Sequence, residues 1–83
     1  SNLKKHKVSF EEAETVFGDL LAAIFLDDGH SLDEKREIII GYSGRNRLLV
    51  VSFTERDGDL IHIISARRAD PDERRKHENE RDR

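Results

Sequence analysis

Residues 48–70 read LLVVSFTERDGDLIHIISARRAD, and this stretch decides the fold of the 83-residue chain. Two apolar runs rich in β-branched residues flank the dipeptide Asp57-Gly58. An Asp-Gly pair between two such runs is a strong signal for a β-hairpin. The stretch therefore predicts two adjacent antiparallel strands joined by a tight turn.

A two-residue turn at Asp57-Gly58 also predicts which residues face each other. Phe53 would then pair with His62 on the sheet face that forms the core, while the other face stays open. The pairs expected on this open face are Leu48 with Arg67, Val50 with Ser65, Ser52 with Ile63, and Thr54 with Ile61. Polar groups among apolar ones are typical of a functional surface. A slip of one residue would move His62 to the open face.

The residues before the hairpin predict a short helix and two more strands. Ser9 and Glu12 form an S-x-x-E capping box, in which each side chain accepts from the backbone amide of the other. A helix over residues 10–17 follows, because its apolar residues recur at helical spacing. Residues 22–27 and 36–42 are apolar or β-branched runs and are expected strands.

A polar helix is expected after the hairpin. Asp70 is a natural N-cap, Pro71 suits the first helical position, and Glu73 completes a second capping box. We expect a single domain over residues 1–78 and a frayed tail over 79–83. The fold class is therefore α+β, with a small antiparallel sheet of three to four strands, N-terminal helices and a C-terminal helix.

Composition excludes several kinds of protein. The chain has no cysteine, so neither a disulfide framework nor a thiolate metal site is available. No stretch is apolar enough to span a membrane and no signal peptide is visible, so a cytoplasmic location without a membrane partner is expected. The net charge of −3 argues against a non-specific nucleic-acid binder. Arginines nevertheless outnumber acids between Arg45 and Arg68, which leaves room for a local basic face.

Motifs for metals and cofactors are missing. The sequence has no P-loop, no H-E-x-x-H, no nucleophile elbow and no zinc spacing. Asp27, Asp28 and His30 could bind a divalent ion, but acid-rich loops are usually solvated. We therefore expect no metal and no cofactor.

Three motifs in order carry a family resemblance. They are KHKVSFEEAETVF (5–17), DDGHSLDEKREIIIGYS (27–43) and RLLVVSFTERDGDLIHIISARRADPDERRKHE (47–78). Together they resemble the BrnT family of bacterial toxins, which are ribonucleases of type II toxin–antitoxin pairs with a RelE-like fold. The resemblance implies a metal-independent endoribonuclease that inhibits translation by cutting RNA. It also implies a cognate antitoxin that binds DNA and represses its own operon.

The sequence departs from the family pattern in three places. The family begins with an additional strand that carries an F-x-W-D-type motif, and the present sequence starts after it. The family usually has a basic residue, often arginine, where this chain has His62, and a glycine where it has Lys7. The missing first strand, the histidine at position 62 and the net negative charge favour the alternative of a catalytically impaired module that only binds its antitoxin.

Metal-free RNA cleavage needs a base, an acid and cations around the phosphate. Arginine matches phosphate oxygens with its planar fork, and histidine exchanges protons near neutral pH. The catalytic candidates that the resemblance promotes are Arg67, Glu55, His62 and Arg47, and the RNA-binding candidates are Arg45, Arg56, Arg68 and His6. Each also has a purely structural interpretation: a surface ion pair, an exposed hairpin rim or a packed histidine.

Overall fold

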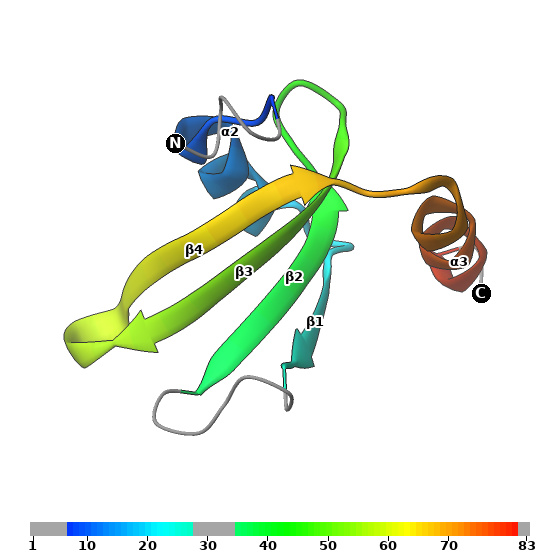
Figure 1. Ribbon diagram of the computed structural model, residues 1–83. Coiled ribbons are helices and arrows are strands. Elements are labelled where there is room, and N and C mark those ends of the chain that lie inside the picture. Colours follow the sequence, from blue (N-terminus) through cyan, green and yellow to red (C-terminus); the bar gives the residue numbers. More distant parts are fainter. Residues whose placement is uncertain (1–6, 28–34, 82–83) are drawn as a thin grey trace.

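A four-stranded antiparallel sheet forms the centre of the computed structural model, which describes residues 7–27 and 35–81 (Figure 1). The strands lie in chain order: β1 (Ala23–Leu26), β2 (Arg36–Tyr42), β3 (Leu48–Arg56) and β4 (Leu60–Arg68). The expected strands at 22–27 and 36–42 are thus confirmed as β1 and β2. The fold class is α+β, as the sequence predicted.

Two helical segments flank the end of the sheet at which β4 finishes (Figure 1). Before the sheet, the α-helix α2 (Phe10–Thr15) continues into the 3₁₀ turn η1 (Val16–Gly18), which confirms a short helix over 10–17. After the sheet, α3 runs over Pro71–Arg81 and confirms the C-terminal helix. Further N-terminal helical structure would fall on residues 1–6, outside the described residues.

The capping box at the start of α2 forms only in part. The Ser9 hydroxyl accepts from the Glu12 amide at 3.0 Å, as predicted. The Glu12 carboxylate does not accept from the Ser9 amide, as a full capping box requires. It accepts from the side chains of Ser43 and Arg47 on the sheet side. A charged partner outside the helix attracts the carboxylate more strongly than the neutral Ser9 amide does.

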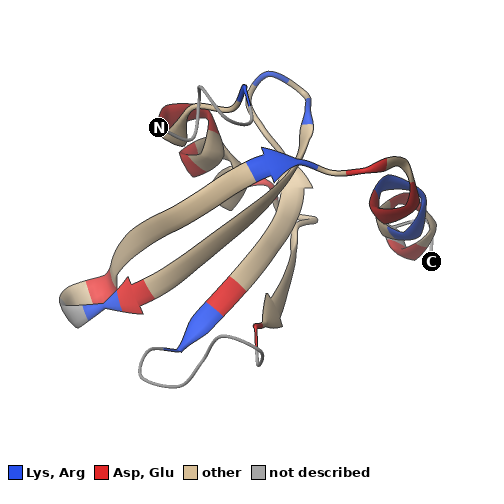
Figure 2. Ribbon diagram, viewed as in Figure 1, with Lys and Arg blue, Asp and Glu red and all other residues tan. Residues whose placement is uncertain are grey.

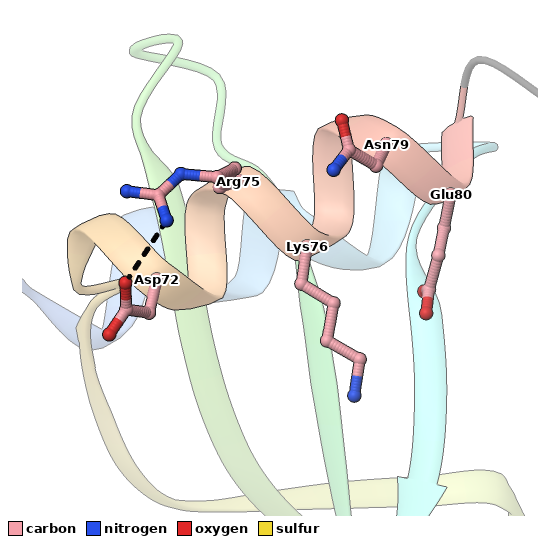
Figure 3. A pocket seen from close by; sticks show the side chains of 5 residues that line it. All are labelled: Asp72, Arg75, Lys76, Asn79 and Glu80. Atoms are coloured by element: carbon pink, nitrogen blue, oxygen red, sulfur yellow. Dashed lines mark ion pairs between the residues drawn. The ribbon is translucent and has the colours of Figure 1, made fainter.

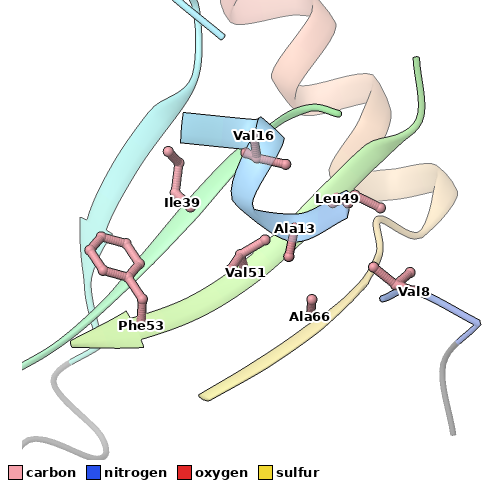
Figure 4. Close-up of a cluster of buried hydrophobic side chains, with 8 residues drawn as sticks. All are labelled: Val8, Ala13, Val16, Ile39, Leu49, Val51, Phe53 and Ala66. Carbon is pink, nitrogen blue, oxygen red and sulfur yellow. The ribbon is translucent and has the colours of Figure 1, made fainter. Parts of the chain in front are cut away.

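The hydrophobic core lies between α2 with η1 and one face of β2–β4. Its buried members are Val8, Ala13, Val16, Ile39, Leu49, Val51, Phe53 and Ala66 (Figure 4). Phe17 packs edge-on against Phe53, with ring centroids 5.0 Å apart. We call this the α2 face of the sheet and keep the term open face for the other.

The predicted register of the hairpin is wrong. Its turn holds three residues, Asp57–Asp59, because Asp59 joins Gly58 in the left-handed region with φ of 68°. Arg56 therefore pairs with Leu60, and Phe53 pairs with Ile63 instead of His62. A β-bulge between Ser52 and Phe53 then shifts the pairing once more towards the end of β4.

The corrected register moves His62 to the open face. His62 pairs with Thr54, so both side chains lie on the side away from the core. This is the one-residue slip that the sequence left open. Closer to the end of β4, Ser52 pairs with Ser65 and Val50 with Arg67. The open face of β4 thus carries His62, Ser65 and Arg67.

The polar helix α3 docks on the sheet through few side chains. His77 is only 5% exposed, and its ring lies 6.1 Å from the ring of Tyr42 on β2. The Tyr42 hydroxyl also donates to Glu78 at 3.1 Å. Within the described residues, no helix is long and apolar enough to cross a membrane.

Strand β1 leaves apolar side chains exposed at the edge of the described sheet. Ile24, Phe25 and Leu26 are 57%, 47% and 54% exposed. An edge strand with this character is typical of a surface that another chain covers.

Candidate nucleic-acid interface

The predicted site residues fall into two groups at opposite ends of the sheet. We call the end with the β2–β3 loop and the last residues of β4 the head, and the end with the β3–β4 turn the tip. Arg45, Arg47, Arg67 and Arg68 lie at the head, whereas Glu55, Arg56 and His62 lie at the tip. At ~3.3 Å per residue, roughly 16 Å separates His62 from Arg67 along β4. His6 lies outside the described residues.

At the head, Arg67 is engaged by α3. Its guanidinium donates to both carboxylate oxygens of Glu73, at 2.7 and 2.8 Å. These hydrogen bonds are the main reason why the pKa of Glu73 falls from 4.5 to about 2. The Arg67 side chain is still 44% exposed. A guanidinium that binds a carboxylate with two parallel bonds also has the geometry for a phosphate.

Arg47 has a structural role that the sequence did not reveal. Its guanidinium donates to the buried carboxylate of Glu12, with Nε 2.9 Å from Oε2, and also to the carbonyl oxygen of Lys7. The Ser43 hydroxyl donates to the same carboxylate at 2.7 Å. This network lowers the pKa of Glu12 to about 2, chiefly through the hydrogen bond from Arg47. It ties the β2–β3 loop to α2 across a long stretch of sequence, so no local pattern predicts it.

Exposed cations surround this network at the head. The Arg45 side chain is 74% exposed, although it approaches Glu12 to 3.9 Å. Arg68 is exposed on the α2 face, where it pairs with Leu49. Figure 2 shows these basic positions on the β2–β3 loop and at the end of β4. A cluster of this kind creates a locally positive potential on a protein of net negative charge.

At the tip, the register brings three polar residues into one row. Arg36 on β2 pairs with Thr54 on β3, and Thr54 pairs with His62 on β4. The sequence did not single out Arg36, because the pattern of the second strand gives no register to the third. Thr54 is 2% exposed, and its hydroxyl has no hydrogen-bond partner among the described residues.

The other two tip candidates lie on different faces. Arg56 pairs with Leu60 and belongs to the open face. Glu55 pairs with Ile61 and therefore points to the α2 face. His62 is on the edge strand and also borders a cleft between α2 and β4. The cleft has a volume of ≈ 400 Å³, and its lining consists of Phe10, Glu14, Phe17, Ile61, His62 and Ile63.

The outer surface of α3 carries mixed charges and makes no comparable site. A shallow hollow there is lined by Asp72, Arg75, Lys76, Asn79 and Glu80 (Figure 3). Arg75 and Asp72 form an exposed ion pair at 3.5 Å. No group of three or more acidic or histidine side chains with metal-binding geometry occurs in residues 7–27 and 35–81.

A small α+β domain with histidine and arginines on an open sheet face has the chemistry of a protein that binds nucleic-acid phosphates. The family model described as "Ribonuclease toxin, BrnT, of type II toxin-antitoxin system" matches residues 1–73. The chain therefore belongs to this family of ribonuclease toxins, for which RNA is the target and an antitoxin is the partner. No curated protein matches the chain.

Proposed function

We propose that this protein is a metal-independent endoribonuclease that inhibits translation by cutting RNA. The observation that carries the proposal is the corrected register, which supports His62 and Arg67 as site residues by aligning both on the open face of β4. The family match supplies the class of reaction. We also propose the RelE-like fold and the cytoplasmic location that the resemblance implies.

His62 and Arg67 have different tasks in this proposal. Imidazole exchanges protons near neutral pH, so His62 serves proton transfer at the bond that breaks. Arg67 holds a phosphate with its planar fork. Because roughly 16 Å separates the two along the strand, they contact different phosphates of one RNA chain. The RNA then runs along the open face between the tip and the head.

The remaining candidates have supporting tasks. Arg56, Arg45 and Arg68 attract flanking phosphates, and exposed cations act mainly by raising affinity in a salt-dependent way. Arg47 adds its charge to the head while it holds the loop on Glu12. Glu55 points to the α2 face, away from the RNA path, so of its two candidate tasks only the orientation of a neighbouring cation at the tip fits this proposal.

We further propose that a DNA-binding antitoxin neutralises the toxin and represses the shared operon. The apolar side chains exposed on β1, Ile24 to Leu26, support a protein partner at that edge. Such a partner buries an apolar surface and supplies strand hydrogen bonds at the same time.

Cleavage of a labelled single-stranded RNA in EDTA tests the proposed activity. We expect the purified protein to cut the RNA, and H62A and R67A to reduce cleavage at least tenfold. R75A is the matched control, because Arg75 is an exposed arginine on α3 whose ion pair is with Asp72. Cleavage that requires a divalent ion, or that survives in both H62A and R67A, would contradict the proposal.

One observation favours a second candidate, a toxin-like module that binds its antitoxin without cutting RNA. The guanidinium groups of Arg67 and Arg47 both donate hydrogen bonds to carboxylates in this structure. A growth assay separates the two functions. Growth arrest on expression, relieved by R67A, supports the ribonuclease, whereas a harmless folded protein that still binds antitoxin supports the module.

A further inference from the structure

We propose that Arg36, Thr54 and His62 form the binding site of the scissile phosphodiester at the tip of the open face. This inference rests on the proposed ribonuclease function and deepens it. It adds Arg36 as the cation that faces His62 across the bond to be cut. We call these three residues the tip row.

The pairing of three neighbouring strands sets the geometry of the tip row. Arg36 pairs directly with Thr54, and Thr54 pairs directly with His62. Directly opposite residues have Cβ atoms about 5 Å apart, so roughly 10 Å separates the Cβ atoms of Arg36 and His62. A long guanidinium side chain and an imidazole both reach a phosphate placed above Thr54 from that separation.

Besides the strand pairing, the buried hydroxyl of Thr54 points to a ligand at the tip row. Its side chain is among the most buried in the molecule, yet its hydroxyl has no hydrogen-bond partner among the described residues. A buried hydroxyl without a partner is costly, so its presence calls for a partner such as a bound ligand, ion or water. In the tip row, the hydroxyl donates to a phosphate oxygen of the bound RNA, for which the side chains that cover Thr54 move aside.

Neighbouring groups suit the same ligand. Asp27 follows β1 in line with the row, and its amide donates to the Arg36 carbonyl at 2.9 Å. It thus lies on the side of Arg36 away from His62, where a carboxylate can orient the guanidinium. One row closer to the head, Ser52 and Ser65 pair on the open face and offer two hydroxyl groups to the RNA backbone.

The cleavage step balances with these residues and water. The 2′-oxygen of the RNA attacks phosphorus, and the bond to the 5′-oxygen breaks, which leaves a 2′,3′-cyclic phosphate and a free 5′-hydroxyl. Water takes the proton of the 2′-hydroxyl. The imidazolium form of His62 protonates the leaving 5′-oxygen and is reprotonated by solvent. Arg36 and Thr54 stabilise the negative charge on the non-bridging oxygens.

Substitutions in the tip row test this assignment against the cleavage assay. We expect R36Q to lower the cleavage rate about 100-fold, because loss of one preorganised charge donor typically costs this much. R36K keeps the charge without the fork, so it should retain more activity than R36Q. T54V should lower the rate about tenfold while the melting temperature stays unchanged or rises, because the lost hydroxyl had no partner. R75A is again the control.

A binding experiment keeps the inference testable apart from the activity. The probe is a single-stranded 2′-deoxy oligonucleotide, which cannot be cut because it has no 2′-hydroxyl. We expect it to shift the NMR signals of the His62 ring in the native protein and in R75A, but much less in folded R36Q. If the native protein cuts RNA and R36Q cuts it at a rate within twofold of the native rate, the tip row is overturned and the proposed function stays intact. If the native protein cuts no RNA and the oligonucleotide leaves the His62 ring signals unshifted, the tip row is overturned as well. If the signals shift in the native protein but not in R36Q, the tip row is supported as a phosphate-binding site.

Discussion

The guanidinium of Arg67 donates two hydrogen bonds to the carboxylate of Glu73, so the residue best suited to hold phosphate already holds an anion. Glu73 comes from the first turn of α3, where it also accepts from the Asp70 amide at 2.9 Å. Under the proposed function, RNA phosphate and Glu73 compete for the same fork. The contact therefore sets the affinity of the head for RNA.

The first prediction concerns this competition. E73Q should bind single-stranded RNA several-fold more tightly than the native protein, because a neutral amide is a weaker competitor for Arg67 than a carboxylate. Fluorescence anisotropy with labelled RNA at fixed salt measures the effect. E80Q is the control, because it removes an equal charge from an exposed position of the same helix. Equal affinities of E73Q and E80Q would argue against phosphate binding by Arg67.

The second prediction concerns the buried carboxylate of Glu12. Its pKa is 4.5 when the chain is unfolded and about 2 when it is folded. A lowered folded pKa stabilises the protein above the unfolded value, and this stabilisation is lost as the pH falls from about 5 towards 2. The shift corresponds to roughly 3 kcal/mol at neutral pH.

Urea unfolding of the native protein and of E12Q measures this effect. E12Q should be less stable at pH 7, because the side chain is 4% exposed and faces Arg47 in the native protein. The difference between the two proteins should shrink towards pH 3, because the Glu12 carboxyl of the unfolded chain, with its higher pKa of 4.5, takes up a proton before the folded one does. A stability difference that does not change with pH would show that the Glu12 charge has no such role.

The third prediction concerns Lys7, which adopts a left-handed conformation with φ of 60°. Glycine occupies this region without steric cost, and the family resemblance also places glycine here. K7G should therefore raise the stability by about 1 kcal/mol, because an L-residue in this conformation costs roughly that much. Thermal unfolding measures the change. K35G is the control, since Lys35 is also exposed and has no positive φ. Equal effects of K7G and K35G on stability would refute the explanation.

The fourth prediction concerns the close packing at Gly41. A Cβ atom at this position would lie 2.8 Å from the Cβ of Ala22 and 3.0 Å from an Asp19 carboxylate oxygen. That carboxylate oxygen accepts from the Tyr42 amide and is not free to move. G41A should therefore cost about 1–3 kcal/mol of stability, as overpacking typically does.

G44A is the matched control for this substitution. A Cβ at Gly44 would meet Thr15 at an ordinary contact distance of 3.5 Å. Chemical unfolding of both variants should therefore show a loss for G41A and almost none for G44A. Comparable stabilities would mean that η1 and the turn after it adjust around residue 41.

Local chemistry was enough to predict the elements of this fold. The Ser9 cap, the β-branched runs of β2 and β3, and the Asp-Gly turn act through neighbouring residues, so their effects can be read in sequence order. The register predicted for the hairpin was wrong, because the backbone of Asp59 lengthened the turn and a bulge near Ser52 shifted the pairing again. One residue of slip exchanges the two faces of a strand, and it moved His62 from the expected core to the open face.

The sequence by itself determined the α+β class, the order of helices and strands, and the kinds of side chain available for a phosphate site. Only the tertiary structure decided which of them meet. The pairing of β2 with β3 brought Arg36 into line with Thr54, and α3 placed Glu73 on Arg67. Glu12 reached Arg47 from a different element. These contacts depend on strand register and helix docking, which are set by packing over the whole core and not by neighbouring residues in the chain.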